Sequence, residues 1–382
     1  MADDPRGRVS NVPNLKSQIR ALAQQAGFDL CGFAGVEPAP HGEFVRAWLN
    51  DGRAATMDYI ANGLAKRLDP TLVLAGARSV VTVGVRYRPP PLPPIDWREQ
   101  LRGRIAAYAL GADYHRTVKR RLKELAGRIA VQYPAAELRP YVDTGPLLER
   151  EWAAAGGLGW FGKNTNILHK EHGSWFFLGE LLTTLDIEPD APTPDHCGTC
   201  VRCLDLCPTQ ALEPGYVLDA RKCISYWTIE HRGAIPRDFR PQLENWVFGC
   251  DVCQEVCPWN DKLARSIEPT VAEALLPSLP DLMGLDEEGF RQRYRGTAVL
   301  RTKREGLLRN TAVVLGNTRN PRAVMCLSRA LDDPSAIVRA HSAWALGRIG
   351  DAAARARLDA VRRCEPDAVV RAEIDNALAE QN

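Results

Sequence analysis

The sequence lacks a long apolar segment and has almost no excess of charge. No stretch of 18 or more apolar residues occurs among its 382 residues, whereas a helix that crosses a bilayer needs about 20. Residues 1–20 are polar, contain Pro5 and Pro13, and show neither the apolar core of a secretory signal nor a twin-arginine pair. A net charge of +2 excludes a global attraction for nucleic acid, so any basic surface must be local. We therefore expect a cytoplasmic protein that does not bind a membrane.

Cysteine, in contrast, is abundant and concentrated in one region. Eight of the eleven cysteines lie between Cys197 and Cys257. Disulfides are rare in the cytoplasm, and clustering of this kind favours metal binding. The isolated Cys31, Cys326 and Cys364 are predicted to be small buried hydrophobic residues.

The spacing of the eight clustered cysteines is that of a bacterial two-cluster ferredoxin. The first group is CGTCVRCLDLCP (197–208), and the second, CDVCQEVCP (250–258), is one cysteine short, a place that Cys223 can fill. Three closely spaced thiolates wrap one 4Fe–4S cluster, and the cysteine before proline ligates the other. The predicted ligands are Cys197, Cys200, Cys203 and Cys257 for the first cluster, and Cys207, Cys223, Cys250 and Cys253 for the second. Four-cysteine zinc sites are the alternative, although the two Cys-Pro ends argue against zinc.

The part of the chain before the cysteines is predicted to be one α+β domain, residues 1–190. It combines apolar stripes at helical spacing with β-branched runs and glycine-bounded apolar segments. The expected elements are helices at 14–26 and 116–132, strands at 28–36, 79–87 and 104–109, and a proline loop at 89–94.

The remaining chain divides into a cysteine region, residues 191–265, and a repetitive region, residues 266–382. Similar segments begin at Leu307, Ile337 and Val369, and each precedes or follows a second expected helix. Their arginines, Arg309, Arg339 and Arg371, are 30 and 32 residues apart. Helix pairs at this period indicate HEAT-like stacking, with an irregular helical bundle as the alternative.

Six motifs stand in order along the chain: YALGADYH (108–115), YVDTGPLLER (141–150), GWFGKNTNIL (159–168), GSWFFLGEL (173–181), CISYWTIE (223–230) and GCDVCQEVCPWN (249–260). With these motifs the chain resembles epoxyqueuosine reductases over nearly its whole length. The proline loop and the last repeat are less typical of the family. The resemblance implies an α+β fold with an N-terminal α/β cobalamin-binding domain, a ferredoxin-like double 4Fe–4S domain and a C-terminal HEAT-like, tRNA-binding domain.

The resemblance also implies an activity. The family performs the last step of queuosine biosynthesis: it reduces epoxyqueuosine to queuosine at the wobble position of tRNA anticodons, using cob(I)alamin that is reduced through two 4Fe–4S clusters. The expected partners are the tRNA anticodon stem-loop and an unidentified electron donor, and the expected state is a monomer. No D-x-H-x-x-G segment occurs, so no protein histidine is expected on the cobalt.

Asp143 is the implied catalytic proton donor and a cofactor contact. Removal of an epoxide oxygen needs a proton on that oxygen, and an enclosed apolar site can raise the pKa of a carboxyl enough to supply it. Asp143 follows the apolar Tyr141 and Val142 and precedes a Gly-Pro turn. Without the family resemblance, the local sequence favours a role of Asp143 as the N-cap of a helix near Pro146 over a role as proton donor.

Further cobalamin contacts are implied at scattered polar positions: Arg67, Lys163, Asn164, Thr165, Ser225 and Thr228. The amides of the glycine-rich turn before Lys163 suit the amide or phosphate groups of the cofactor. A surface arginine at Arg67 and ordinary turn hydroxyls at Ser225 and Thr228 are the alternatives. Asp113, Tyr114 and His115 are weaker candidates for the pocket, because Asp113 can equally be a helix cap.

Residues 291–309 carry seven positive charges and one negative charge. Such a stretch beside helical repeats suits a tRNA phosphate backbone, or else it is a solvated helix face. Tyr226 and Trp227 are candidates for stacking on unpaired bases, or else for core packing.

Two other functions remain open from the residues. One is a corrinoid reductase for small molecules, similar to reductive dehalogenases, which would leave the repeats and the basic stretch without a purpose. The other is a non-catalytic electron carrier, which would not need the large N-terminal domain. Measurements of bound corrinoid and of tRNA affinity across salt concentrations distinguish all three.

Overall fold

The computed structural model describes residues 15–87, 92–213, 216–261 and 274–380. Much of the predicted proline loop and the expected boundary at residue 265 lie outside the described residues. The longer strands are β1 (Leu30–Gly35), β2 (Ser79–Arg86), β4 (Leu138–Tyr141), β7 (Phe176–Thr183) and β10 (Trp246–Phe248), and the short ones are β3 (Arg104–Ile105), β5 (Trp160–Phe161), β6 (Ile167–Leu168), β8 (Leu212–Glu213) and β9 (Val217–Leu218). No helix in the described ranges is both long and apolar enough to cross a membrane.

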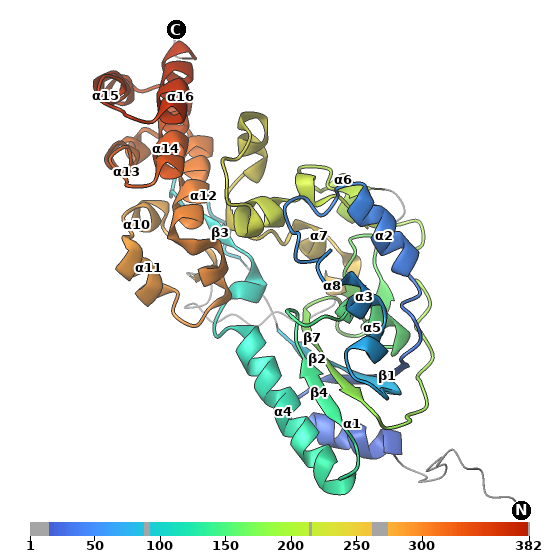
Figure 1. Ribbon diagram of the computed structural model, residues 1–382. Helices are drawn as coiled ribbons and strands as arrows, with labels where there is room; N and C mark the ends of the chain where they lie inside the picture. Colours follow the sequence, from blue (N-terminus) through green and yellow to red (C-terminus); the bar gives the residue numbers. More distant parts are fainter. Residues whose placement is uncertain (1–14, 88–91, 214–215, 262–273, 381–382) are drawn as a thin grey trace, which may run out of the picture.

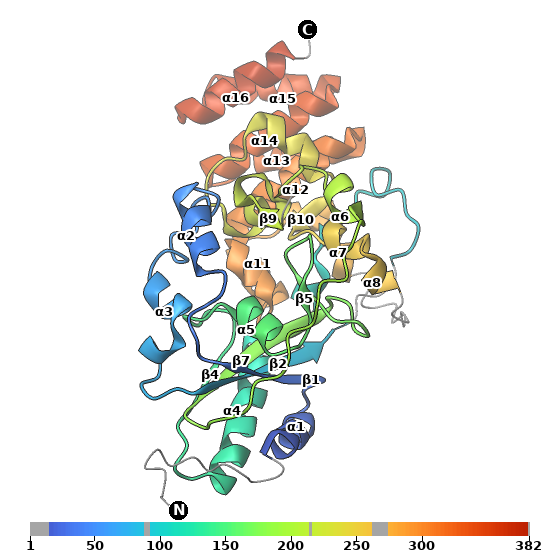
Figure 2. The ribbon, with the colours of Figure 1, turned by 90° about the vertical axis from the view of Figure 1, so that its right-hand side faces the viewer.

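The N-terminal part is built on an antiparallel sheet with the strand order β1-β2-β7-β4. Helices α1 (Leu15–Gln25) and α4 (Tyr114–Gln132) cover one face (Figure 2). There Val81, Val83 and Leu181 pack on Leu122 and Ile129. Full burial of such a side chain stabilises the fold by about 1.5–3 kcal/mol. The predicted helices at 14–26 and 116–132 and strands at 28–36 and 79–87 are confirmed with shifted ends.

The opposite face of the sheet is packed by α5 (Glu149–Ala155), with α2 (Gly42–Asn50) and α3 (Leu64–Leu68) further out. Trp152 of α5 is 2% exposed and packs on Val80 and Leu182. Side chains alternate across a strand, so Glu180, two positions before Leu182, also points to this face. Glu180 is 0% exposed, which is unusual for a carboxylate.

The predicted strand at 104–109 is wrong beyond its second residue. β3 ends at Ile105, and a 3-10 turn over Ala107–Ala109 follows. The buried Asp251 carboxylate accepts a hydrogen bond from the Ala107 N–H at 2.7 Å, which draws the chain away from a strand path. β3 pairs in parallel with β10 of the cysteine region.

One hydrophobic core is shared by all three predicted regions. It joins Ile105, Trp246 and Phe248 to Leu279 and Leu307 of the helical part. The proposed division into residues 1–190, 191–265 and 266–382 therefore describes segments that fold onto a common core. Figure 1 shows the sheet and the last helices at opposite ends of the molecule, with the cysteine region between them.

The C-terminal region is a stack of helix pairs, as its repeats predict. The inner helices α12 (Lys303–Thr318), α14 (Ala336–Ile349) and α16 (Ala368–Ala379) pack in series. Outer helices α13 (Val324–Ala330) and α15 (Ala352–Arg362) alternate with them (Figure 1). The small α6 (Arg202–Asp205), α7 (Val252–Glu255) and α8 (Pro258–Asp261) belong to the cysteine region, and α10 (Leu279–Met283) and α11 (Glu287–Arg293) lead into the stack.

The three recurrent arginines do not have one role. Arg339 donates to the Asp333 and Pro334 carbonyls, and Arg371 donates likewise to those of Glu365 and Pro366. Arg309 is 1% exposed and instead donates to the carbonyls of Trp227, His231 and Gly233. The first repeat thus holds the chain that follows Cys223. Of the isolated cysteines, Cys31 and Cys326 are partly buried, but Cys364 is exposed, so the prediction of burial is wrong there.

Candidate active site

Asp143 lies in a loop between β4 and α5, in a backbone conformation that is rare for a non-glycine residue. Its φ is +49°, and such strain tends to occur at functional sites. The Asp143 N–H donates to the Glu149 carboxylate, which holds the loop in this shape. Helix α5 begins at Glu149, and its N-cap, Leu148, makes no side-chain capping bond. The alternative of Asp143 as a helix cap is therefore wrong.

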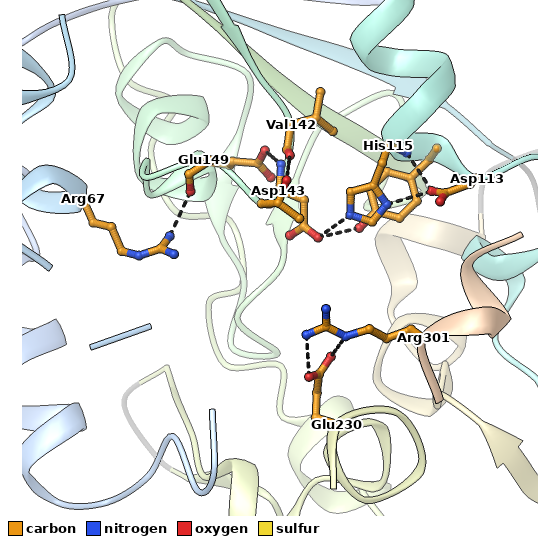
Figure 3. A network of polar contacts seen from close by, with 11 residues as sticks. Arg67, Asp113, His115, Val142, Asp143, Glu149, Glu230 and Arg301 are labelled. Carbon is orange, nitrogen blue, oxygen red and sulfur yellow. Dashed lines mark hydrogen bonds and ion pairs between the residues drawn. The ribbon is translucent and has the colours of Figure 1, made fainter. Parts of the chain in front are cut away.

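Two side chains of α4 contact the same oxygen of Asp143. Tyr114 Oη donates to Asp143 Oδ2 at 2.9 Å, and His115 Nε2 lies 2.8 Å from that atom. His115 Nδ1 lies 2.7 Å from Asp113 Oδ1. Asp113 also caps α4 through the His115 N–H, so it serves both roles that its position suggests. Asp113, His115 and Asp143 form a carboxylate–imidazole–carboxylate chain (Figure 3).

The pKa of Asp143 differs from the raised value that the sequence analysis expects. Burial by itself raises the pKa of Asp143, but hydrogen bonds from His115 and Tyr114 outweigh it and hold that pKa below its ordinary value. The bond to Asp143 raises the pKa of His115 against the effect of burial. The expected raised pKa of Asp143 is therefore wrong in this state. These two directions favour a proton on the imidazole, 2.8 Å from the carboxylate.

Residues from all three regions border the space in front of Asp143 (Figure 3). Arg67 Nη1 donates to the Gly145 carbonyl at 3.1 Å, which places the predicted Arg67 beside the Asp143 loop. Arg301, from the helical region, forms an ion pair with Glu230 of the cysteine region at 2.8 Å. The hydrogen bond to Glu230 raises the pKa of Arg301, and the charge of Asp143 adds to this rise. Sequence spacing gives no sign that Glu230 and Arg301 would meet there.

The first predicted set of cysteines surrounds a common cavity. It has a volume of about 280 Å³ and is lined by Cys197, Cys200, Cys203 and Cys257 together with Trp259. Burial, together with the charges of Cys257, Cys197 and Cys200, raises the pKa of Cys203 to about 11. Four crowded thiols of this kind ionise when bound iron offsets their charge. The set therefore fits the first predicted cluster.

The second predicted set is also brought together by the fold. Burial raises the pKa of Cys253 well above its ordinary value, and the charges of Cys223 and Cys207 contribute. The pKa of Cys250 is likewise raised, first by burial and then by Cys253 and Cys223. No three His, Cys, Asp or Glu side chains in the described ranges are placed to hold a single metal ion. The second ligand set stays a prediction, which the proximity of Cys223 and Cys207 to Cys253 supports.

The predicted cofactor contacts after Gly162 point toward the cysteine loops. Lys163 Nζ donates to the carbonyls of Gly198 and Cys200, at 2.7 and 3.0 Å. Asn164 Nδ2 donates to the Cys253 carbonyl at 3.0 Å. Thr165 has a φ of +64°, and its carbonyl accepts from Arg150. The side chains of Lys163 and Asn164 thus support the cysteine loops, and contacts of this turn with cobalamin stay a prediction.

Ser225 and Thr228 are the two hydroxyl residues predicted to contact cobalamin, and only Ser225 lies beside a predicted cluster ligand. The Ser225 hydroxyl and N–H lie beside the Cys223 sulfur and offset the rise that burial gives to its pKa. Thr228 is 0% exposed; its hydroxyl donates to the Ile224 carbonyl and accepts from the Gly249 N–H. The Thr228 side chain is therefore not available to a cofactor, because its hydroxyl links two backbone segments.

The basic stretch at 291–309 is used partly inside the protein and partly at its surface. Arg304 is paired with Asp333, Arg309 is buried, and Arg301 faces the candidate active site. Arg291, Arg293, Arg295 and Lys303 are exposed, so these four positions stay candidates for contact with tRNA. Tyr226 is also buried, and its hydroxyl bonds to Thr56 at 2.8 Å, so stacking of Tyr226 on a base is excluded in this state.

A second basic surface, which the sequence analysis missed, borders the Asp143 loop. Arg116, Lys119, Arg120 and Lys123 are exposed on one face of α4. With His115, Val142 and Thr144 they line a groove of about 420 Å³. None of these four cations forms an ion pair with a residue in the described ranges. Their spacing of three and four residues was a signal that could have identified this surface.

Comparisons with known proteins agree with this arrangement. Residues 67–144 match the family described as epoxyqueuosine reductase QueG, DUF1730; residues 196–260 match a 4Fe–4S double cluster binding domain, and residues 297–379 match HEAT repeats. An epoxyqueuosine reductase of Xanthomonas campestris pv. campestris is 42% identical over 340 residues, which are 87% of this chain and 96% of the relative. One of Pseudomonas aeruginosa is 39% identical over 351 residues, which are 88% of this chain and 95% of the relative.

Solved structures give the same result for the fold. An epoxyqueuosine reductase with an epoxyqueuosine-modified tRNA stem loop superposes with a TM-score of 0.91 at 29% identity, over 97% of this chain and all of that one. The enzyme of Bacillus subtilis, with its catalytic aspartate loop swung out of the active site, gives a TM-score of 0.89 at 28% identity, with coverage of 97% and 100%. This chain belongs to the epoxyqueuosine reductase family.

Proposed function

We propose that this protein reduces epoxyqueuosine to queuosine at the wobble position of tRNA anticodons. The observation that carries this proposal is the hydrogen-bonded pair of His115 and Asp143, which shares one space with Arg301 and Glu230. Within the same fold, two sets of four cysteines provide ligands for an electron path. An acid and an electron supply are the two requirements for removing an epoxide oxygen.

The reaction consumes two electrons and two protons and releases the epoxide oxygen as water. When bound, cobalamin and the two 4Fe–4S clusters supply the electrons. Arg67, Asp143 and Ser225 are the predicted residues best placed for cobalamin, together with the turn of Lys163, Asn164 and Thr165. Arg67 has a buried Nε without a partner in the described chain, and such an atom favours a polar ligand against the Asp143 loop.

The protein's own contribution is the control of a proton at Asp143. Oδ2 is occupied by Tyr114 and His115, while Oδ1 makes no hydrogen bond with any described residue. His115 passes its proton to Oδ2 of Asp143, and the protonated carboxyl then rotates to present that proton to the departing oxygen. Asp113 keeps the imidazole oriented through Nδ1. The side chain of Asp143 is 52% exposed, and the substrate would complete its enclosure.

The Asp143 loop is built to change position. Asp143 is held by its neighbours in a strained conformation, and Gly145 follows two residues later. The catalytic aspartate loop of the B. subtilis relative is found swung out of its active site. Such a motion would admit a tRNA base and then close on it.

The remaining assignments are part of the same proposal. The protein works as a cytoplasmic monomer, receives electrons from a donor that is not yet identified, and uses segments 1–190, 191–265 and 266–382 for cobalamin, the clusters and tRNA. The shared core described above supports a fixed arrangement of the three segments during electron transfer.

An anaerobic assay tests the proposed function directly. The purified protein, with added cobalamin and a chemical reductant, is expected to convert epoxyqueuosine in a tRNA anticodon stem-loop to queuosine, measured by mass spectrometry of the digested RNA. Omission of either cobalamin or the reductant should abolish conversion. Binding of corrinoid without conversion of this RNA would contradict the proposal.

The basic face of α4 is the proposed site for the tRNA backbone near the active site. Exposed cations at Arg116, Lys119, Arg120 and Lys123 border the groove beside Asp143. Each phosphate contact releases counterions, so binding weakens as salt increases. The position of this face beside the acid suits the backbone of a nucleotide whose base lies at Asp143.

Replacing Lys119 and Lys123 together by alanine should weaken binding of the stem-loop. The slope of log affinity against log salt should become shallower by about 2, because each lysine accounts for about one phosphate contact. Fluorescence anisotropy at several salt concentrations measures both quantities. The pair Arg46 and Arg78, exposed outside α4 and outside the segment proposed to bind tRNA, provides a double alanine control of equal charge with an unchanged slope. Equal slopes for both doubles would refute the assignment.

A further inference from the structure

Two glutamates lie one behind the other beneath the Asp143 loop. Glu149 accepts the N–H of Asp143, as described above. Glu180 lies in the centre of the sheet, where it pairs with Thr82 of β2 and Tyr141 of β4 in register. Its side chain faces α5, on which Glu149 is the first residue. The pair therefore connects the interior of the sheet with the loop that carries Asp143.

If both glutamates are ionised, the inner carboxylate, Glu180, has no hydrogen-bond donor beside it. Both oxygens of Glu180 are buried, and neither accepts a hydrogen bond from a donor in the described chain; Thr82 Oγ1 and Trp152 Nε1 are also buried without a partner there. An uncompensated carboxylate in such a place is very costly. A proton on Glu180 resolves the conflict, because its hydroxyl can then donate to the Glu149 carboxylate.

The charges around the pair point in the same direction. Burial raises the pKa of Glu180 well above its ordinary value, and the charge of Glu149 and the bond to it raise that pKa further. Burial raises the pKa of Glu149 to about 7, and the charge of Asp143 contributes, while Arg150 opposes the rise. Two such carboxyls share one proton at neutral pH and titrate as a unit.

We propose that Glu149 and Glu180 form a proton reserve that recharges Asp143 during turnover. This inference rests on the proposed function, in which each epoxide takes up two electrons and two protons. The first proton reaches the oxygen from His115 through Asp143. The second leaves Glu180, passes to Glu149 and from there to the Asp143 carboxylate, which delivers it so that the oxygen departs as water.

The positions explain why two glutamates are used. The Glu149 carboxylate accepts the backbone N–H of Asp143. Glu149, the outer member of the pair, therefore stays attached to the Asp143 loop. Glu180 is anchored by the sheet and keeps its proton away from solvent. Glu149 and Glu180 do not contact the substrate in this arrangement; they are positioning and relay residues that act through Asp143.

The Glu180→Gln variant tests the reserve in the complete enzyme with clusters and cobalamin. The amide can still donate to Glu149 but cannot release a proton, so kcat should fall by about tenfold or more with KM for the stem-loop unchanged. Glu180→Asp, which still carries a proton, should recover part of the rate. An unchanged kcat in Glu180→Gln would overturn the inference.

Infrared spectroscopy provides a readout that does not depend on turnover. The unchanged protein should show a protonated carboxyl band at pH values where an ordinary glutamate is already ionised, because burial raises the pKa of Glu180 well above its ordinary value. The band should be absent in Glu180→Gln and present in Glu137→Gln, an exposed control before β4. Absence of the band from the unchanged protein would also overturn the inference. Failure of that protein to reduce the stem-loop at all would instead overturn the proposed function, and the inference with it.

Discussion

Replacing Asp143 by asparagine should lower kcat by at least about a hundredfold, the usual contribution of a positioned general acid. The amide can occupy the same place between Tyr114 and His115, but it has no proton to give to the departing oxygen. The absorption spectra of the clusters and of bound cobalamin should not change. Single-turnover conversion of the epoxyqueuosine stem-loop measures the loss.

The protonation of His115 provides a second readout for the same variant. The ion pair with Asp143 raises the pKa of His115, so its stabilisation is complete below the ordinary histidine pKa and is lost as the pH rises through the raised value. In Asp143→Asn the histidine should release its proton at lower pH, which NMR titration can follow. Asp186→Asn, an exposed position after β7, is the control. A fully active Asp143→Asn variant would refute the role of Asp143.

Replacing Cys253 by serine should remove one cluster and abolish reduction of the stem-loop. Burial raises the pKa of Cys253, and the charges beside it include Cys223 and Cys207 of the same predicted cluster and Cys203 of the other. We expect the loss of about half of the iron and acid-labile sulfide. The variant should also unfold more readily, because the free energy of cluster binding contributes to the folding of the cysteine region.

Cys364→Ser is the matched control for this experiment. Cys364 is exposed at the end of α15, far from both sets, so iron, sulfide and activity should all be retained. Iron and sulfide are measured on protein prepared without oxygen. Full iron content in Cys253→Ser would contradict the ligand assignment, and zinc in place of iron in the unchanged protein would contradict the cluster interpretation itself.

Elements defined by local patterns were predicted well from the sequence. The helices at α1 and α4 and the strands β1 and β2 follow from apolar periodicity, and the helix pairs of the C-terminal region follow from the repeat. The strand expected at 104–109 failed because a distant carboxylate, Asp251, binds the Ala107 N–H. A contact between residues so far apart in the sequence leaves no trace in a local pattern.

The candidate site was predicted only in part. The motif around Asp143 identified this residue. Its pKa was expected to be raised by burial, whereas hydrogen bonds from Tyr114 and His115 lower it. The basic stretch at 291–309 was also assigned to tRNA, whereas Arg304 and Arg309 are used for internal contacts. A side chain's charge is visible in the sequence, while its partner is decided by folding.

The sequence by itself identified the iron–sulfur region and the helical repeats that follow it, and it predicted the cluster ligands, because cysteine spacing and helical period are properties of short stretches of chain. The tertiary structure alone decided the proton chemistry. Asp113, His115, Asp143, Glu149 and Glu180 come from separate elements, and their pKa values depend on burial and on neighbours that only the folded chain brings together.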